Sequence, residues 1–349
     1  MGKTISGALV LLAVAAAGAG AQPVAGTAAQ PVPVTVDNFV RAETDRYFAA
    51  AASTGFGKFF HYRDFAPLEQ VRVVRVNRDT LYSVGVFDLD AGPLTVTLPD
   101  AGTRYLSLVA YNEDHVASPA IYRPGRHTFS REQVGTRYVT LGVRILFDPA
   151  DAADRGRANA LQDAIGVQQA ASGRFEVPAW DAAGLKRVRD ALLALGRTLP
   201  DTRRMFGGRE QVDPVRHLIG TAMAWGGNRE ADALYLNVTP ARNDGQTVYR
   251  LRVAEVPVDG FWSVSVYDEA GWFKPNPYQA YTLNSVTAKR GADGAVDIQF
   301  GGCDGRTANC LPTPPGWNYM VRLYRARAEV LDGRWTFPQA QAQAQALPR

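Results

Sequence analysis

The sequence predicts a mainly β protein with two domains of the β-sandwich or jelly-roll type and an intervening helical segment. Apolar and polar residues alternate in short runs before residue 150 and after residue 230, which is typical of antiparallel strands with one buried face. Between these regions, over 151–225, the apolar residues follow the helical period. A length of 349 residues is also the length expected of two domains.

The first 21 residues predict a secretory signal. Lys3 is their only charge, an apolar stretch runs from Ile5 to Ala17, and the small residues Ala19-Gly-Ala21 follow. The alternative is a membrane anchor, but this stretch is short and mostly Ala, Gly and Val, whereas a span needs about 20 strongly apolar residues. We therefore expect a periplasmic or secreted protein without a membrane span after signal cleavage.

Residues 22–36 are rich in Ala, Pro, Gly and Gln and predict a flexible leader, and 37–150 predict an N-terminal β domain. A helix is expected to begin near Asp37 or Asn38. The alternating runs in the rest of this domain predict strands at Arg72–Val76, Leu94–Leu98 and Tyr105–Tyr111.

Residues 151–230 predict a helical segment packed on the N-terminal domain. Asp181 is a suitable N-cap for one helix, and Gly196 is a suitable end for it. Asp213-Pro214 combines an N-cap with proline at the first position of a second helix.

Residues 231–338 predict a C-terminal β-sandwich domain. Alternation is clear at 249–253, 262–266 and 296–300, and four Asp-Gly pairs predict the turns between strands. An even number of cysteines in an exported chain predicts a disulfide, here between Cys303 and Cys310. The Gln-Ala sequence of 339–349 predicts a disordered tail.

Several function classes are disfavoured. The net charge of +4 falls to +3 without Lys3, and the basic residues are scattered, so no nucleic-acid partner is expected. The sequence has no Gly-x-Ser-x-Gly nucleophile elbow and no phosphate-binding P-loop. The four histidines are isolated from one another and from the cysteines, so we expect no metal and no cofactor.

The segment Asn77–Ser83 places Arg78, Asp79 and Tyr82 between two β runs. One interpretation is structural, with an Arg–Asp ion pair and a buried hydroxyl that hold a strand end. The other is that the three side chains line a pocket and contact a ligand. The sequence favours the structural interpretation.

Asn112, Asp114 and His115 directly follow an apolar run. An acid and a histidine at a strand end form a candidate acid–base unit, so Asp114 and His115 are the candidate catalytic residues and Asn112 a candidate ligand contact. Adjacent strand residues point to opposite faces, so the two are expected to work with different partners. A structural role is the alternative.

Asn284 and Arg322 are two further candidate ligand contacts. Asn284 lies in a segment rich in turn residues, so its alternative role is loop geometry. Arg322 lies in an otherwise apolar and aromatic strand, where a guanidinium needs a carboxylate or carbonyl partner. That partner is either a protein acid or an anionic group of a ligand.

Taken together, these segments resemble two families of unknown function that occur together, domain-of-unknown-function families 1254 and 1214. The resemblance covers about residues 40–338 and implies two β-sandwich-like domains joined by a helical segment, with no established reaction and no catalytic residues. Cys310 departs from the pattern, since tryptophan is expected there. The residues that carry the resemblance to family 1254 are Asn77–Ser83, Asp88-Leu89, Gly92-Pro93 and Arg104-Tyr105, and those for family 1214 are Phe261–Ser263, Tyr267-Asp268, Asn276-Pro277, Asp293-Gly294, Asn309–Pro312, Arg322–Tyr324 and Gly333–Trp335.

The sequence thus leaves three hypotheses for function. The first is a small polar or anionic ligand bound in a cleft between the β domains, with or without hydrolysis, because such clefts are favoured ligand sites. The second is a non-catalytic interaction module of the cell envelope. The third is a carbohydrate-active enzyme, which needs two carboxylates at a defined separation. The sequence does not indicate an oligomeric state.

Overall fold

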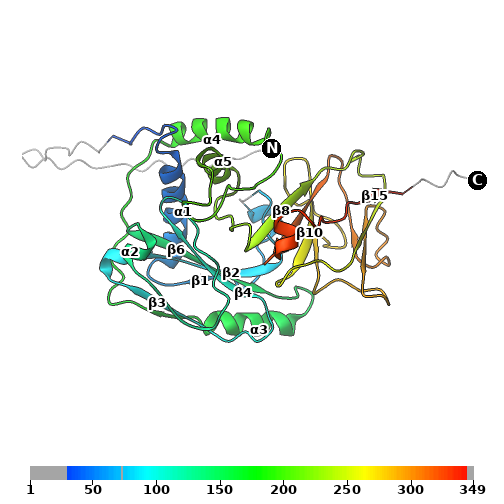
Figure 1. Ribbon diagram of the computed structural model, residues 1–349, viewed down its shortest axis with the longest axis horizontal. Helices are drawn as coiled ribbons and strands as arrows, with labels where there is room; N and C mark the ends of the chain where they lie inside the picture. The colour runs from blue at the N-terminus through cyan, green and yellow to red at the C-terminus, as the bar shows by residue number, and fades with distance from the viewer. Residues whose placement is uncertain (1–29, 72–73, 344–349) are drawn as a thin grey trace, which may run out of the picture.

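The computed structural model describes residues 30–71 and 74–343, so the predicted signal at 1–21 lies outside the described residues. The prediction of a mainly β protein is confirmed. The described strands form four sheets, and all but one of their strand pairs are antiparallel. Figure 1 shows the sheets of the N-terminal half on one side of the molecule and those of the C-terminal half on the other.

The N-terminal half is built on two sheets that share an apolar core. In the first, the strand order is β1 (Phe60–His61), β2 (Thr80–Asp88), β6 (Tyr138–Leu146) and β4 (Leu106–Asn112). In the second, it is β5 (Gly125–Phe129), β3 (Leu94–Leu98) and β7 (Gly166–Gln168). Both faces of β4 and β6 are buried, which makes the four-stranded sheet the central layer of this half.

The strand expected at Arg72–Val76 is not formed in its described part, 74–76. Arg75 has a left-handed backbone, with φ of 55°. Its N–H donates to the carbonyl of Gly271 in the C-terminal half, at 2.9 Å. A contact with a distant segment therefore replaces the strand pairing that the apolar pattern predicted.

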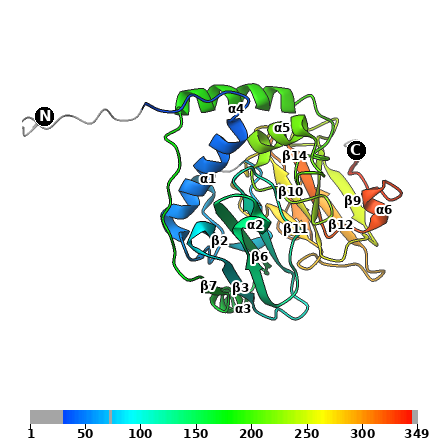
Figure 2. The ribbon, with the colours of Figure 1, turned by 60° about the vertical axis from the view of Figure 1, so that its left-hand side comes forward.

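Three helices pack together over one side of the N-terminal half (Figure 2). They are α1 (Phe39–Gly55), α4 (Ala182–Gly196) and α5 (Pro214–Ala224). The side chain of Asp181 caps α4 and that of Asp213 caps α5, as the sequence predicted. α3 (Ala152–Asp163) lies at the opposite end of this half, and β7 interrupts the predicted helical segment because it pairs with β3.

The C-terminal half is a sandwich of two four-stranded sheets around one core. The inner sheet faces the N-terminal half, and its order is β11 (Thr282–Asn284), β10 (Trp262–Tyr267), β14 (Asn318–Tyr324) and β8 (Ala233–Val238). The outer sheet has the order β13 (Cys310–Leu311), β12 (Val296–Phe300), β9 (Tyr249–Val253) and β15 (Gln341–Ala342). The short elements that remain are η1 (Leu68–Gln70), η2 (Leu89–Ala91), α2 (Arg131–Val134) and α6 (Ala328–Leu331).

The disulfide between Cys303 and Cys310 is present and closes a loop that ends at β13. The expected disordered tail differs from the structure in part, because residues 341–342 form β15 on the edge of β9. Within 30–71 and 74–343, no helix combines the length and apolar character needed to cross a bilayer.

Candidate ligand-binding site

The four-stranded sheet of the N-terminal half carries a polar row on the face opposite its core. Tyr82 of β2, Arg144 of β6 and Ser107 of β4 are direct cross-strand neighbours. Their sequence neighbours Leu81 and Val143 belong to the apolar core. Because successive side chains of a strand point to opposite faces, the three polar side chains share the other face.

The inner sheet of the sandwich carries a matching row. Asn284, Ser263, Arg322 and Tyr235 are direct neighbours across β11, β10, β14 and β8. The residues between them in sequence, such as Val264, pack in the core of the sandwich. Ser263 has no exposed surface and Arg322 is only 2% exposed, so this polar face is covered rather than solvated.

The segment before β2 joins the two halves. Asp79 accepts hydrogen bonds from Ser263 at 2.6 Å and from Thr282 at 3.2 Å. The hydroxyl of Tyr267 donates to the carbonyl of Val76 at 3.0 Å. Figure 1 shows β2, where this segment ends, next to the inner strands β8 and β10. The segment before β2 therefore joins the two halves by hydrogen bonds to the polar face of the inner sheet.

Arg322 is held entirely by groups of the protein. It donates to Ser265 Oγ at 2.8 Å, to the carbonyl of Arg75 at 2.9 Å and to the Tyr267 hydroxyl at 2.7 Å. Burial raises the pKa of the Asp79 carboxyl, although the charge of Arg322 acts in the opposite direction. This arrangement matches the structural interpretation of both residues, in which they fix one half on the other.

Arg144 is buried with fewer partners. Its Nη2 lies 3.3 Å from the Tyr111 hydroxyl and 3.3 Å from the carbonyl of Gly226, and no ion pair with a described carboxylate is found. Nη1 is buried and has no hydrogen-bond partner in the described part of the chain. Burial alone would lower the pKa of Arg144. The nearby oxygens of Tyr111, Tyr82 and Tyr235 have the larger effect, so the pKa of Arg144 is raised.

Two buried hydroxyls on the same sheet face as Arg144 form no hydrogen bond of normal geometry in the described chain, although Tyr105 lies close to one of them, Ser107. They are Ser107 Oγ, on the strand paired with Arg144, and Thr140 Oγ1, four residues before Arg144 on β6. Between Thr140 and Arg144, on the same face, Gly142 leaves open space, because an added Cβ would contact only the Tyr111 ring, at 4.0 Å. Arg144, Thr140 and Ser107 thus lie on the face of the sheet where Gly142 carries no side chain.

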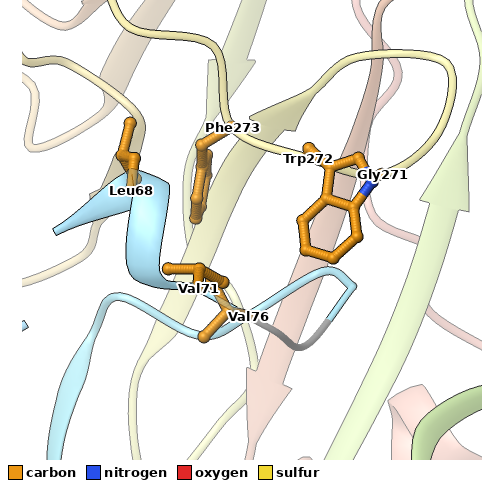
Figure 3. A pocket seen from close by; sticks show the side chains of 6 residues that line it. All are labelled: Leu68, Val71, Val76, Gly271, Trp272 and Phe273. Carbon is orange, nitrogen blue, oxygen red and sulfur yellow. The ribbon is translucent and has the colours of Figure 1, made fainter. Parts of the chain in front are cut away.

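An apolar cavity of about 240 Å³ lies at the Arg322 end of the interface (Figure 3). Phe273, one of its walls, packs against Tyr267 with ring centroids 4.5 Å apart. The cavity suits an apolar group rather than an anion, because none of its lining residues within 30–71 and 74–343 carries a charge. Its lining residues are Leu68, Val71, Val76, Gly271, Trp272 and Phe273.

His115 and Asp114 contact different partners, as expected, but both lie beyond the end of β4, so strand alternation is not the reason. His115 is 1% exposed, its Nδ1 contacts Thr221 Oγ1 at 2.8 Å, and its Nε2 accepts the N–H of Gly226 at 2.8 Å. Burial, helped by the nearby His217, lowers the pKa of His115 well below its usual value. Because both ring nitrogens are engaged, His115 positions the Gly226 peptide, whose carbonyl contacts Arg144.

The other predicted residues divide between the interface and its surroundings. Asp79, Tyr82, Asn284 and Arg322 converge on the interface, and Asn284 adds a hydrogen bond that lowers the pKa of Asp79. Arg78 turns away from Asp79 and donates to the carbonyl of Ala66 at 3.0 Å. Asp114 and Asn112 have their partners outside the interface. Asp114 pairs with Arg41 and Arg209, and Asn112 Oδ1 accepts the N–H of Val116 at 3.0 Å.

Sequence reasoning missed Arg144, Ser107, Thr140 and Tyr111. A usable signal existed for Arg144, since it stands in the apolar run Val143-Arg144-Ile145 just as Arg322 stands in its own strand. Serine and threonine in strands carry no such signal.

Asp45 in α1 is a second buried carboxyl with an incomplete set of partners. It is 2% exposed, its Oδ2 accepts from Trp180 Nε1 at 2.9 Å, and its Oδ1 has no partner in the described chain. Burial raises the pKa of Asp45 to about 6. The hydrogen bond from Trp180 lowers this pKa, and the negative charge of the nearby Glu113 raises it. The folded chain therefore binds this proton below about pH 6, whereas an unfolded carboxyl binds it only below 3.8.

We expect Asp45→Asn to raise the free energy of unfolding at pH 7. The folded pKa is raised, so the cost of ionised Asp45 is complete above about pH 6 and disappears as the pH falls towards 3.8. The difference between these values sets an upper limit of about 3 kcal/mol. Urea unfolding of both proteins between pH 4 and 8 measures it, and a gain that does not change with pH would contradict the assignment.

Comparison with known proteins finds matches to the two families that the sequence resembles and to solved structures of similar fold. Residues 56–128 match the family described as "Protein of unknown function (DUF1254)" and residues 235–328 match "Protein of unknown function (DUF1214)". The N-terminal and C-terminal positions of the two families are those that the resemblance predicted. No curated protein matches the chain.

Two solved structures are similar in fold. A crystal structure of a Vibrio parahaemolyticus protein aligns with a TM-score of 0.68 at 16% identity, over 88% of this chain and 98% of that one. An uncharacterized protein from Burkholderia cenocepacia aligns with a TM-score of 0.51 at 13% identity, over 88% of this chain and 86% of that one. At these identities the likeness concerns the fold alone.

Proposed function

We propose that the chain binds a small anionic organic molecule between the polar face of β2, β6 and β4 and the inner sheet of the sandwich. One observation carries this proposal: Arg144 is buried, has no carboxylate partner among the described residues and leaves Nη1 unpaired. A buried guanidinium without a counter-charge costs free energy. A ligand carboxylate or phosphate supplies that charge in the planar geometry that arginine binds best.

The surroundings of Arg144 support the same function. Ser107 and Thr140 offer two hydroxyls that would donate to further ligand oxygens. Gly142 provides space between them. A few convergent polar groups at the junction of two halves are characteristic of small-molecule sites.

The structure gives less support to the other hypotheses. A hydrolytic step through His115 would require a free ring nitrogen, and both of its nitrogens are engaged. An interaction module that uses the polar face of the inner sheet would need that face to be accessible, but its central residues Ser263 and Arg322 are buried.

The test is calorimetric titration with matched pairs of acids and their neutral analogues. Aliphatic carboxylates are compared with the corresponding amides, and phosphate monoesters with the corresponding alcohols, so the two arms separate the two anion classes. We expect acids of one class to bind and their neutral analogues not to bind. Equal binding of an acid and its amide would overturn the proposal, because Arg144 would then not recognise charge.

We also propose that the chain is exported and acts in the periplasm or outside the cell, on the support of the signal-like residues 1–21. The intact mass of protein purified from its native host is expected to correspond to a chain that begins near Gln22. A purified chain that retains residues 1–21 would contradict export with cleavage.

A further inference from the structure

Tyr82 has an unusual set of contacts at its hydroxyl oxygen. The amide Nδ2 of Asn77 donates to this oxygen at 3.0 Å and also contacts Thr80 Oγ1 at 3.0 Å. The orientation of the Asn77 amide is fixed, because its Oδ1 accepts the N–H of Asp79 at 2.9 Å. Asn77 therefore presents N–H groups, and not its carbonyl, to Tyr82.

A cation approaches Tyr82 from the neighbouring strand. Tyr82 and Arg144 are direct cross-strand partners, and the guanidinium carbon lies 5.3 Å from the centre of the Tyr82 ring. Arg144 and the Thr80 hydroxyl also lie within hydrogen-bonding reach of the Tyr82 side chain. Donors and positive charge around an oxygen stabilise its ionised form.

We propose that Tyr82 ionises before the other tyrosines and acts as a proton acceptor for the ligand bound at Arg144. Its pKa agrees with this role. Burial acts to raise that pKa, but Arg144 and Asn77 lower it below the usual tyrosine value. Tyr111, on the other side of Arg144, has a raised pKa because its burial dominates.

The remaining ionisable groups that face Tyr82 do not compete for this role. Tyr111 of β4, Tyr324 of β14 and Tyr235 of β8 surround the same space. Burial and Asp79 raise the pKa of Tyr324 well above its usual value. Tyr235 instead accepts a hydrogen bond from Asn228 at 3.0 Å. Arg144 is thus the one cation opposite Tyr82 in the strand register, and it is the group that favours the phenolate.

The chemical step follows from this placement. The Tyr82 phenolate takes a proton from an O–H or an acidic C–H next to the anionic group of the ligand, and the electron pair of that bond stays on the ligand. Tyr82 becomes a neutral phenol, and the new negative charge on the ligand lies near Arg144. This step rests on the proposed binding site, whereas the early ionisation of Tyr82 does not.

The experiment is a spectroscopic pH titration of tyrosine absorbance at 295 nm on the full chain and on Tyr82→Phe. The difference between the two curves isolates Tyr82. Tyr62→Phe is the control, because the Tyr62 side chain is 49% exposed and lies away from Arg144 in the strand register. We expect the Tyr82 difference curve to have its midpoint below that of Tyr62. Arg144→Met should move the Tyr82 midpoint upward by about one pH unit or more.

Far-UV circular dichroism across the titration restricts the comparison to folded protein. Asn77→Leu gives a second route to the same result, since loss of its N–H should also raise the midpoint. A Tyr82 midpoint at or above that of Tyr62 would overturn the inference, even if acids bind at Arg144. Early ionisation of Tyr82 without any acid binding would instead overturn the proposed ligand site and leave the ionisation established.

Discussion

Replacing Arg322 with methionine is expected to lower the free energy of unfolding by about 3–5 kcal/mol, the typical cost when a buried carboxyl loses the opposite charge that acts on it. The substitution leaves Asp79 buried without its counter-charge. It also removes the donor from three acceptors, which are Ser265 Oγ, the Arg75 carbonyl and the Tyr267 hydroxyl. Urea unfolding, monitored by tryptophan fluorescence, measures the change.

The control for this prediction is a double-mutant cycle with Asp79→Asn. If the two residues stabilise the interface together, the double variant should lose about 1–3 kcal/mol less than the sum of the single losses. Additive losses would show that Arg322 and Asp79 act independently. A stability of Arg322→Met equal to that of the parent would contradict the structural role of Arg322.

Replacing Arg144 with methionine is expected to have the opposite effect on stability and a large effect on binding. Arg144 has no carboxylate partner among the described residues and one unpaired nitrogen, so a methionine of similar length removes a buried guanidinium that only tyrosine oxygens and a carbonyl surround there. We expect the free energy of unfolding to stay the same or to rise by about 1–3 kcal/mol. We expect affinity for the acid found by titration to fall about 30- to 1,000-fold, because the charged partner of the ligand is lost.

Arg144→Lys separates charge from geometry. Lysine keeps the charge but not the planar donor pair, so it should retain part of the affinity. A loss of stability in Arg144→Met as large as that in Arg322→Met would assign Arg144 to the structural interface and contradict its role in binding. Arg144 and Arg322 stand on facing sheets and are both buried, so the stability change of one variant can be compared directly with that of the other.

Alternation predicted the strands well but not what covers them. The pattern at 262–266 predicted β10 with one apolar and one polar face. A polar face usually meets solvent, yet Ser263 and Ser265 have no exposed surface, because the segment before β2 covers them. The contact between Asp79 and Ser263 joins residues 184 positions apart, and no local pattern encodes that pairing.

The candidate site was predictable only in part, because a local pattern indicates a buried charge but not its partner. An arginine in an apolar strand indicates a buried charge wherever it occurs, and this criterion identified Arg322 and applies equally to Arg144. It does not show whether the partner of that charge belongs to the protein. His115 illustrates the reverse case, since its position suggested proton transfer, but Thr221 and Gly226 occupy its nitrogens.

The final strand, β15, also covers part of the edge of the outer sheet. β9 would otherwise be an edge strand of the outer sheet, with free backbone N–H and C=O groups able to pair with another chain. Gln341 and Ala342 pair with Arg250 and Tyr249 of β9, and the N–H of Gln343 extends the contact to the carbonyl of Val248. A few residues of a Gln-Ala sequence without a core of their own thus occupy backbone groups at the start of β9 that could otherwise pair with another chain.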